Sequence, residues 1–165
     1  MTATIKNRHR LKRKEIQQLQ ERISRFFTLD AFPNHVTVER GQIEGTTFFF
    51  VDGSPLLFLH DDQLFFTLQG IAHYHPHEKR VVVDMGAVKF VTNGADVMAP
   101  GIVDADEAIV PGDHVWICDE RHHKTLAIGV AILDGVQMKQ QQKGKAIALV
   151  HYVGDQWWKH IAKSL

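Results

Sequence analysis

The sequence predicts an α+β protein made of two small domains. An amphipathic helical pattern covers residues 12–27, and apolar and polar residues alternate from residue 36 onward. A polar segment containing a proline, at residues 73–80, then separates two runs of short strands. We therefore expect an N-terminal helix with an antiparallel meander in residues 1–77 and a small, partly closed barrel in residues 78–165.

The first domain begins with the helix and continues as strands. Apolar residues of the helix recur at spacings of three and four, and Pro33 prevents any continuation. The segment Asp52-Gly53-Ser54-Pro55 has strong turn chemistry, and a short helix is expected at residues 67–74. The expected apolar face of the first helix consists of Ile16, Leu19, Ile23, Phe26 and Phe27, and the strands are expected at 36–38, 46–51, 56–59 and 64–68.

The second domain is expected to consist mostly of short strands. Gly112-Asp113 and Asp134-Gly135 are turn signals between them. Asp155 is a candidate N-cap of a terminal helix, in which at least one of Trp157 and Trp158 should be buried. The expected strands cover residues 81–83, 102–103, 115–118, 126–133 and 147–152.

Charge is balanced over the 165 residues but not along the chain. Residues 1–25 hold eight Lys/Arg and two Glu, a net charge of +6, and the other 140 residues have a net charge of −6. Such asymmetry is typical of contact with nucleic acid or an acidic surface, whereas the alternatives are a solvated basic helix face and a disordered, soluble arm. The basic residues concerned are Lys6, Arg8, Arg10, Lys12, Arg13 and Lys14.

Several classes of function are disfavoured. The chain has no dinucleotide-binding glycine pattern, no phosphate loop, no nucleophile elbow, no CxxC and no HExxH, so we expect no catalytic residue and no cofactor. The single Cys118 lies in an apolar strand and fits a reducing compartment. No apolar stretch is long enough to span a bilayer, and no secretory signal is visible, which favours a cytoplasmic protein.

Two groups of histidines are candidate sites. In an extended chain, His73, His75 and His77 would lie on one face and could bind a metal. Pro76 and the position at a domain boundary favour a solvated linker, so no metal site is predicted. His122-His123 is expected at a hairpin tip, as a solvent-exposed turn rather than a catalytic base.

The segment of residues 81–102 carries the most information. Asp84 is a candidate N-cap for a helix over residues 85–93, and Gly94 is the expected residue after its end. Pro100-Gly101 fits a type II turn. Local structure alone accounts for these residues, without a ligand.

What local structure leaves unexplained is a surface of very small side chains. Ala87, Ala95 and Ala99 accompany the glycines, and Lys89 is a cation that could hold a phosphate. Such a surface lets a nucleotide approach the main-chain N–H and C=O groups closely, as recognition of an unstacked RNA end requires. RNA is therefore the first partner to consider.

The same segment resembles the signature of the PUA domain. The shared pattern is VVDxGAxxFVxxGADVMxPGI over residues 82–102, and residues 127–131 and 151–155 resemble the later strands of that domain. The whole chain, with its basic helix and phenylalanine-rich meander, is similar to stand-alone archaeal PUA proteins. Those are related to the malignant T-cell-amplified sequence proteins and to ligatin-type translation initiation factors.

The resemblance implies a non-enzymatic RNA-binding protein whose PUA pseudobarrel contacts the acceptor (CCA) end of tRNA, or rRNA, on the small ribosomal subunit in translation initiation or recycling. A further translation factor as partner is implied only by analogy. One alternative is an accessory subunit of a tRNA- or rRNA-modifying enzyme, and another is a protein-interaction adaptor without RNA binding. The implied groove comprises Gly86, Ala87, Lys89, Phe90, Gly94, Ala95, Asp96, Val97, Met98 and Tyr152.

Overall fold

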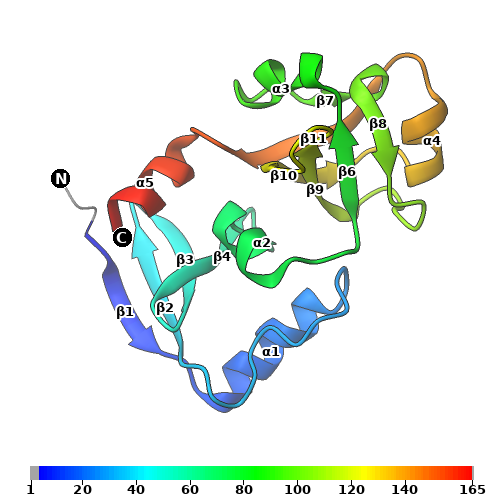
Figure 1. Cartoon of the computed structure of the whole chain (residues 1–165). Coiled ribbons are helices and arrows are strands. Elements are labelled where there is room, and N and C mark those ends of the chain that lie inside the picture. The colour runs from blue at the N-terminus through cyan, green and yellow to red at the C-terminus, as the bar shows by residue number, and fades with distance from the viewer. Residues whose placement is uncertain (1–3, 165) are drawn as a thin grey trace. The chain divides into compact units, whose positions relative to one another are not determined.

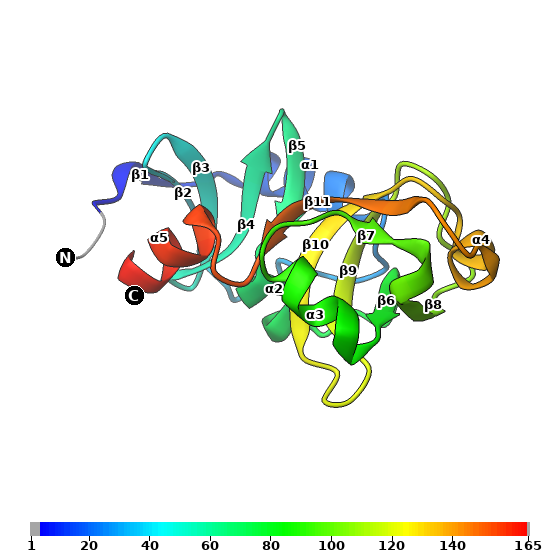
Figure 2. The same cartoon turned by 90° about the horizontal axis from the view of Figure 1, so that it is seen from above.

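The computed structural model describes residues 4–164, which form two compact units. The first contains the chain up to His75 together with the last helix, and the second runs from Pro76 to Asp155 (Figures 1 and 2). The predicted α+β class is confirmed. Each unit is described by itself below.

The first unit is a five-stranded antiparallel meander accompanied by helices. Its strands lie in the order β1-β2-β3-β4-β5, so each strand pairs with its neighbour in the sequence. Tight turns join β2 to β5 in succession, as antiparallel neighbours allow, whereas β1 is connected to β2 through α1 and a loop. The elements are β1 (Lys6–Arg10), α1 (Arg13–Ile23), β2 (Val38–Ile43), β3 (Thr46–Val51), β4 (Ser54–His60), β5 (Gln63–Phe66), α2 (Leu68–Tyr74) and α5 (Gln156–Ser164).

Phenylalanine rings fill the core of this unit. Phe48, Phe50 and Phe58 are almost completely buried. Phe27 meets Phe66 edge to face, with 5.1 Å between the ring centroids. The predicted apolar face of α1 is confirmed, since Leu19, Ile23 and Phe27 are buried and Ile16 and Phe26 are half-buried. The helix itself ends at Ile23, four residues before the predicted end.

The basic segment before α1 is not a disordered arm. Lys6–Arg10 forms the edge strand β1, which pairs with β2 through the partners His9–Arg40 and Arg10–Glu39. All five of its side chains are exposed, so neither burial nor alternation marks it as a strand in the sequence. Backbone pairing with a distant strand decided its conformation.

The last helix belongs to the first unit. From the sequence alone, it is expected in the second domain, residues 78–165. The Trp157 ring lies 4.8 Å from that of Phe58 between centroids, and its Nε1 donates to the Thr46 Oγ1 at 3.0 Å. The prediction that one tryptophan is buried is confirmed, because Trp157 is buried whereas Trp158 is exposed. The sequence pattern showed that α5 needs a core but could not show which one.

The second unit is a curled, mixed six-stranded sheet, as the predicted pseudobarrel requires. The strand order is β7-β11-β10-β9-β6-β8, in which β6 and β9 are parallel and the other pairs antiparallel. The elements are β6 (Arg80–Val83), α3 (Met85–Val91), β7 (Val97–Met98), the 3-10 helix η1 (Ala99–Gly101), β8 (Ile102–Ala105), β9 (His114–Asp119), β10 (Thr125–Ala131), α4 (Gly135–Gln140) and β11 (Lys145–Tyr152). The strand β7 and the helix α4 were not predicted.

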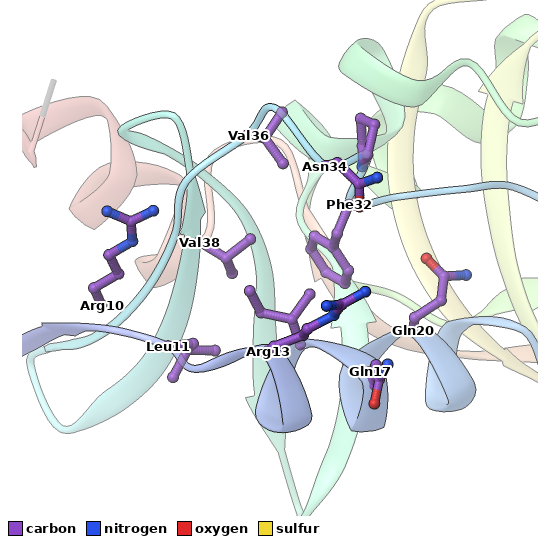
Figure 3. A pocket seen from close by; sticks show the side chains of 11 residues that line it. Arg10, Leu11, Arg13, Gln17, Gln20, Phe32, Asn34, Val36 and Val38 are labelled. Carbon is purple, nitrogen blue, oxygen red and sulfur yellow. The ribbon is translucent and has the colours of Figure 1, made fainter.

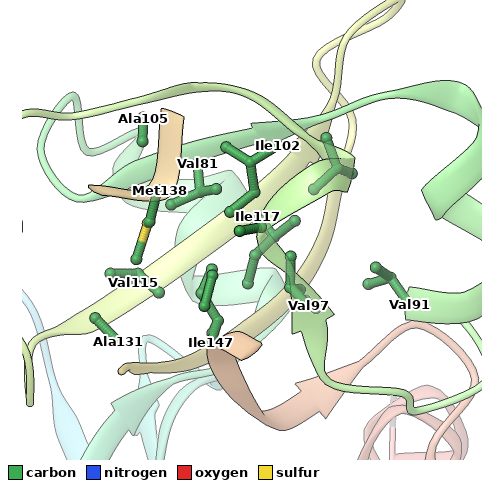
Figure 4. Close-up of a cluster of buried hydrophobic side chains, with 14 of the residues drawn as sticks. Val81, Val91, Val97, Ile102, Ala105, Val115, Ile117, Ala131, Met138 and Ile147 are labelled. Atoms are coloured by element: carbon green, nitrogen blue, oxygen red, sulfur yellow. The ribbon is translucent and has the colours of Figure 1, made fainter. Parts of the chain in front are cut away.

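Aliphatic side chains of moderate size fill the core of this unit (Figure 4). Val81, Ile117 and Ile147 are fully buried, and Met138 reaches the same cluster from α4. The backbone of Gly129 in β10 runs close to β11, because a Cβ there would lie 2.5 Å from the carbonyl oxygen of Ala148. Small residues therefore permit the tight curl of the sheet.

Candidate nucleic-acid interface

The start of α3 is fixed by three hydrogen bonds. The Asp84 carboxylate accepts from the Ala87 N–H at 2.8 Å, which confirms Asp84 as the N-cap. The Asp84 N–H donates to the Gly101 carbonyl at 2.9 Å, and the Met85 N–H donates to the Glu120 carboxylate at 3.1 Å. The first turn of α3 is thereby tied to η1 and to the end of β9.

The predicted type II turn at Pro100-Gly101 is wrong, because these residues belong to η1 and the φ of Gly101 is not positive. Proline is well tolerated in the first turn of a helix, because the N–H group that it lacks would have no partner within the helix there. The reason for glycine is space: a Cβ on Gly101 would lie 3.1 Å from the Cβ of Ala87. Small residues on both sides let η1 approach α3.

The other end of α3 rests against Tyr152. The helix ends at Val91 rather than at Asn93, and Gly94 follows with a φ of +87°. A Cβ on Gly94 would lie 2.7 Å from the Tyr152 hydroxyl oxygen. Tyr152 packs partly buried against the core, so it supports the segment that follows α3.

Between α3, η1 and β7 lies a groove of about 660 Å³. Most of the predicted RNA-binding residues of this unit line it, whereas Lys89, Gly94 and Tyr152 do not. Two large apolar side chains are exposed here, Phe90 at 58% and Met98 at 46%. The lining residues are Asp84, Gly86, Ala87, Phe90, Val91, Ala95, Asp96, Val97, Met98, Pro100, Gly101 and Lys145.

The charges of this groove are few, and some are already used. The Asp96 carboxylate accepts from the Leu149 N–H at 2.9 Å and lies 3.2 Å from the Lys145 ammonium. Asp96 therefore holds the segment before β7 against β11. The Lys89 ammonium lies 5.2 Å from the centroid of the Phe90 ring, within cation–π range.

Lys145 also lines the groove, although it is not among the site residues expected from the sequence. It reaches the groove because β11 pairs antiparallel with β7 in a register that sets Lys145 opposite Met98. No local pattern around Lys145 signals this position, since 47 residues separate it from Met98. The pairing of the two strands is the only cause.

In the first unit, Arg8 is committed to a neighbour. Its guanidinium donates two hydrogen bonds to the Glu39 carboxylate, at 3.0 and 2.9 Å, and its Cζ lies 4.9 Å from the centroid of the Phe50 ring. The bond to Glu39 raises the pKa of Arg8, and the same bond lowers the pKa of Glu39. Arg8 thus stabilises the edge of the sheet.

The other predicted basic residues are exposed. Arg10 and Arg13 line a second pocket, of about 540 Å³, between α1 and the loop that precedes β2 (Figure 3). Phe32 contributes to the wall of this pocket. Lys6, Lys12 and Lys14 are exposed, and the backbone N–H of Lys12 donates to the Glu15 carboxylate at the start of α1.

The histidines of the boundary segment do not lie along an extended chain. His73 belongs to α2, and His75 ends that helix in the left-handed conformation with a φ of +48°. Among residues 4–164, no group of three metal-ligating side chains occurs. Cys118 is buried, and this burial raises the pKa of its thiol to about 11. No helix within the described part of the chain is long and apolar enough to cross a membrane.

A helix-backed meander followed by a curled mixed sheet, with a groove lined by small and apolar residues, defines the class of two-part PUA proteins. The model of the PUA domain matches residues 79–153, and the model of a domain of unknown function, DUF1947, matches residues 7–74. The chain belongs to the family of small proteins that join these two domains.

Its relatives come from archaea and eukaryotes. An uncharacterized protein of Methanocaldococcus jannaschii is 41% identical over 93% of this chain and 96% of its own length. Translation machinery-associated protein 20 of Saccharomyces cerevisiae is 35% identical over 66% of this chain, and the match spans 63% of the yeast protein. A malignant T-cell-amplified sequence 1 homolog of Drosophila melanogaster is 31% identical over 65% of this chain and 61% of its own.

Solved structures show the same architecture. A hypothetical protein of Pyrococcus horikoshii has a TM-score of 0.82 at 32% identity and covers 92% of this chain and 98% of its own. A PUA-domain protein of Aeropyrum pernix, at 24% identity, has a TM-score of 0.87 over 98% of both chains, which shows the shared fold.

Proposed function

We propose that this protein is a non-enzymatic RNA-binding factor that holds the single-stranded acceptor end of a tRNA in the α3–η1–β7 groove while acting in cytoplasmic translation on the small ribosomal subunit. The observation that carries the proposal is the groove itself, which combines exposed Phe90 and Met98 with a floor of glycine and alanine.

The chemistry of the groove suits unstacked nucleotides. Aromatic and apolar side chains offer surfaces on which a base can stack, at about 1–3 kcal/mol per base. Small exposed residues such as Gly86 and Ala95 let a base or sugar edge approach the main chain closely. The ammonium of Lys89 lies beside Phe90 and is available for a phosphate, whereas Lys145 lines the groove in an ion pair with Asp96.

The role in translation is supported by the relatives. The yeast relative carries translation machinery in its name, and this chain spans only 63% of that protein. The two proteins are 35% identical over the matched residues, which supports a shared role in translation, and co-sedimentation with small ribosomal subunits tests it.

The central experiment measures affinity for a tRNA with and without its CCA end, together with co-sedimentation with small subunits. Loss of affinity on removal of CCA, with subunit association, supports the proposal. Phe90→Ala should weaken binding of the intact tRNA by roughly 10- to 100-fold, because the stacking surface is lost. Val103→Ala is the matched control, since Val103 is also exposed but lies outside the groove.

The basic residues of β1 and α1 are proposed to add phosphate contacts. Because Arg8 is bound to Glu39, five residues remain for this role: Lys6, Arg10, Lys12, Arg13 and Lys14. Replacing these five by Gln should reduce the slope of log K against log salt by roughly 3.5 if each contacts a single-stranded phosphate. An unchanged slope would remove them from the interface.

Two other functions give different results in the same experiments. An accessory subunit of a tRNA- or rRNA-modifying enzyme would bind RNA without associating with small subunits. An adaptor for protein partners would bind no RNA even at low salt. The exposed apolar side chains of the groove are what such an adaptor would use instead.

A further inference from the structure

The hairpin tip between β9 and β10 is a basic surface beside the groove. Residues 120–124 read Glu-Arg-His-His-Lys, and all five are exposed. Within the described part of the chain, the side chains of Arg121 and Lys124 form no ion pair with an acidic residue. The guanidinium of Arg121 and the ammonium of Lys124 are thus both exposed to solvent, three positions apart in the sequence.

The buried carboxylate of Asp119 holds this tip in one conformation. It accepts hydrogen bonds from the backbone N–H groups of Arg121 at 2.9 Å, His122 at 2.6 Å and Lys124 at 2.9 Å. The bond from His122 does most to keep the pKa of Asp119 below its usual value, although burial opposes it. A carboxylate bound by three N–H groups fixes the loop, so less conformational entropy is lost when a ligand binds.

The tip is also attached to the groove. Glu120 donates its backbone N–H to the Val83 carbonyl at 2.9 Å, and its carboxylate accepts from the Met85 N–H. Val83 and Met85 flank Asp84, which lines the groove. Figure 2 shows the β9–β10 loop projecting beside α3. The base of this tip is therefore fixed beside the start of α3, at one end of the groove.

The groove needs cations from outside itself. Its lining contains the carboxylates of Asp84 and Asp96 and a single ammonium, that of Lys145, so its own net charge is negative. The second unit as a whole, residues 76–155, holds eight Lys/Arg and eleven Asp/Glu. A polyanion entering this groove gains from positive charge at its rim.

We propose that the tip at residues 120–124 binds the sugar–phosphate backbone of the RNA strand whose end occupies the groove, with Arg121 and Lys124 as the phosphate contacts. This inference rests on the proposed function and adds a second contact region to it. The contact is electrostatic and independent of base sequence.

The test compares three proteins: the unmodified chain, the variant R121Q/K124Q and the control K139Q/K159Q. The control removes the same charge from Lys139, which pairs with Glu107 at 2.8 Å, and from the exposed Lys159, and neither lysine lines the groove. The probe is a labelled RNA stem-loop that ends in single-stranded CCA, titrated at several salt concentrations. We expect R121Q/K124Q to bind about 20-fold more weakly at 0.1 M salt and to lose roughly 1.4 from the salt slope, as two phosphate contacts predict.

The outcomes separate the two proposals. If the unmodified protein binds no RNA, the proposed function fails. If it binds and R121Q/K124Q matches it, or if K139Q/K159Q weakens binding equally, the tip is not a contact region and the groove proposal stands. Both side chains are exposed and Asp119 keeps its backbone bonds, so equal unfolding midpoints should show that the variant is folded.

Discussion

The two units fill their cores with different kinds of side chain. The first buries phenylalanine rings against an antiparallel meander, whereas the buried cluster of the second, in the described residues, consists of Val, Ile, Leu, Met and Ala. Gly129 and Gly101 mark places in the second unit where elements approach too closely for a side chain. In the second unit these close approaches lie beside the groove and within the curled sheet, whereas in the first unit Gly70 of α2 approaches the Leu56 carbonyl.

The surface chemistry of the units differs in the same way. The first unit has eleven Lys/Arg against eight Asp/Glu, and the second has the reverse, eight against eleven. The first unit can therefore contribute long-range attraction to RNA through charged side chains. The second unit offers a groove with a stacking surface, and only a few of its Lys and Arg side chains are available to contact phosphates. This difference predicts which substitutions affect stability and which affect binding.

The largest effect is expected from removing aromatic volume in the first unit. Phe58→Ala should lower the free energy of unfolding by about 3–5 kcal/mol, because the ring is fully buried and touches Phe48, Phe65 and Trp157. Hydrogen exchange measured by mass spectrometry would localise the loss to the first unit. Phe90→Ala, which truncates an exposed ring, is the control and should cost less than about 0.5 kcal/mol.

Adding volume should damage the second unit. Gly129→Ala places a Cβ 2.5 Å from both the Ala148 carbonyl oxygen and the Cγ2 of Ile147. Because one neighbour is backbone, β10 or β11 must shift, and we expect a loss of about 1–3 kcal/mol. Gly86→Ala in α3 meets only the Asp84 carboxylate, at 3.3 Å, and should be nearly neutral in urea unfolding. Equal losses in the two variants would contradict the tight-curl explanation.

Asp84 and Lys89 should separate folding from binding within a single helix. Asp84→Ala removes the cap of α3 and should cost about 1 kcal/mol of stability. Lys89→Gln changes an exposed side chain, so its stability should stay within about 0.5 kcal/mol while its affinity for RNA falls. Thermal unfolding and RNA titration of both variants check this. A stable Asp84→Ala protein would show that α3 does not depend on its cap.

The smallest effect concerns pH and the first unit. The Arg8 guanidinium lowers the pKa of Glu39, so the folded state favours the ionised carboxylate. The resulting stabilisation is present above the pKa of Glu39 in the unfolded chain and is lost as the pH falls through the lowered pKa of the folded state. Because both side chains are partly exposed, it should be below about 1 kcal/mol. Glu39→Gln should therefore lower the urea midpoint slightly at pH 7 and leave it unchanged in strong acid.

Much of the local structure was predictable because it follows from chemistry between near neighbours. The apolar face of α1, the cap at Asp84, the glycine after α3 and the short helix α2 each depend on residues within a few positions of one another. The turn at Pro100-Gly101 was misjudged because two conformations suit a Pro-Gly pair locally. Glycine is required at position 101 because Ala87, fourteen residues earlier in the sequence, lies close to it in the fold.

The sequence by itself determined the α+β class, the small-residue segment that forms much of the groove and the uneven distribution of charge. Only the tertiary structure decided that the basic segment is an edge strand, that α5 packs with the first unit and that Lys145 joins the groove. The physical reason is the same in each case. These features depend on backbone pairing or burial between segments tens of residues apart, and such contacts leave no periodic signal in either segment alone.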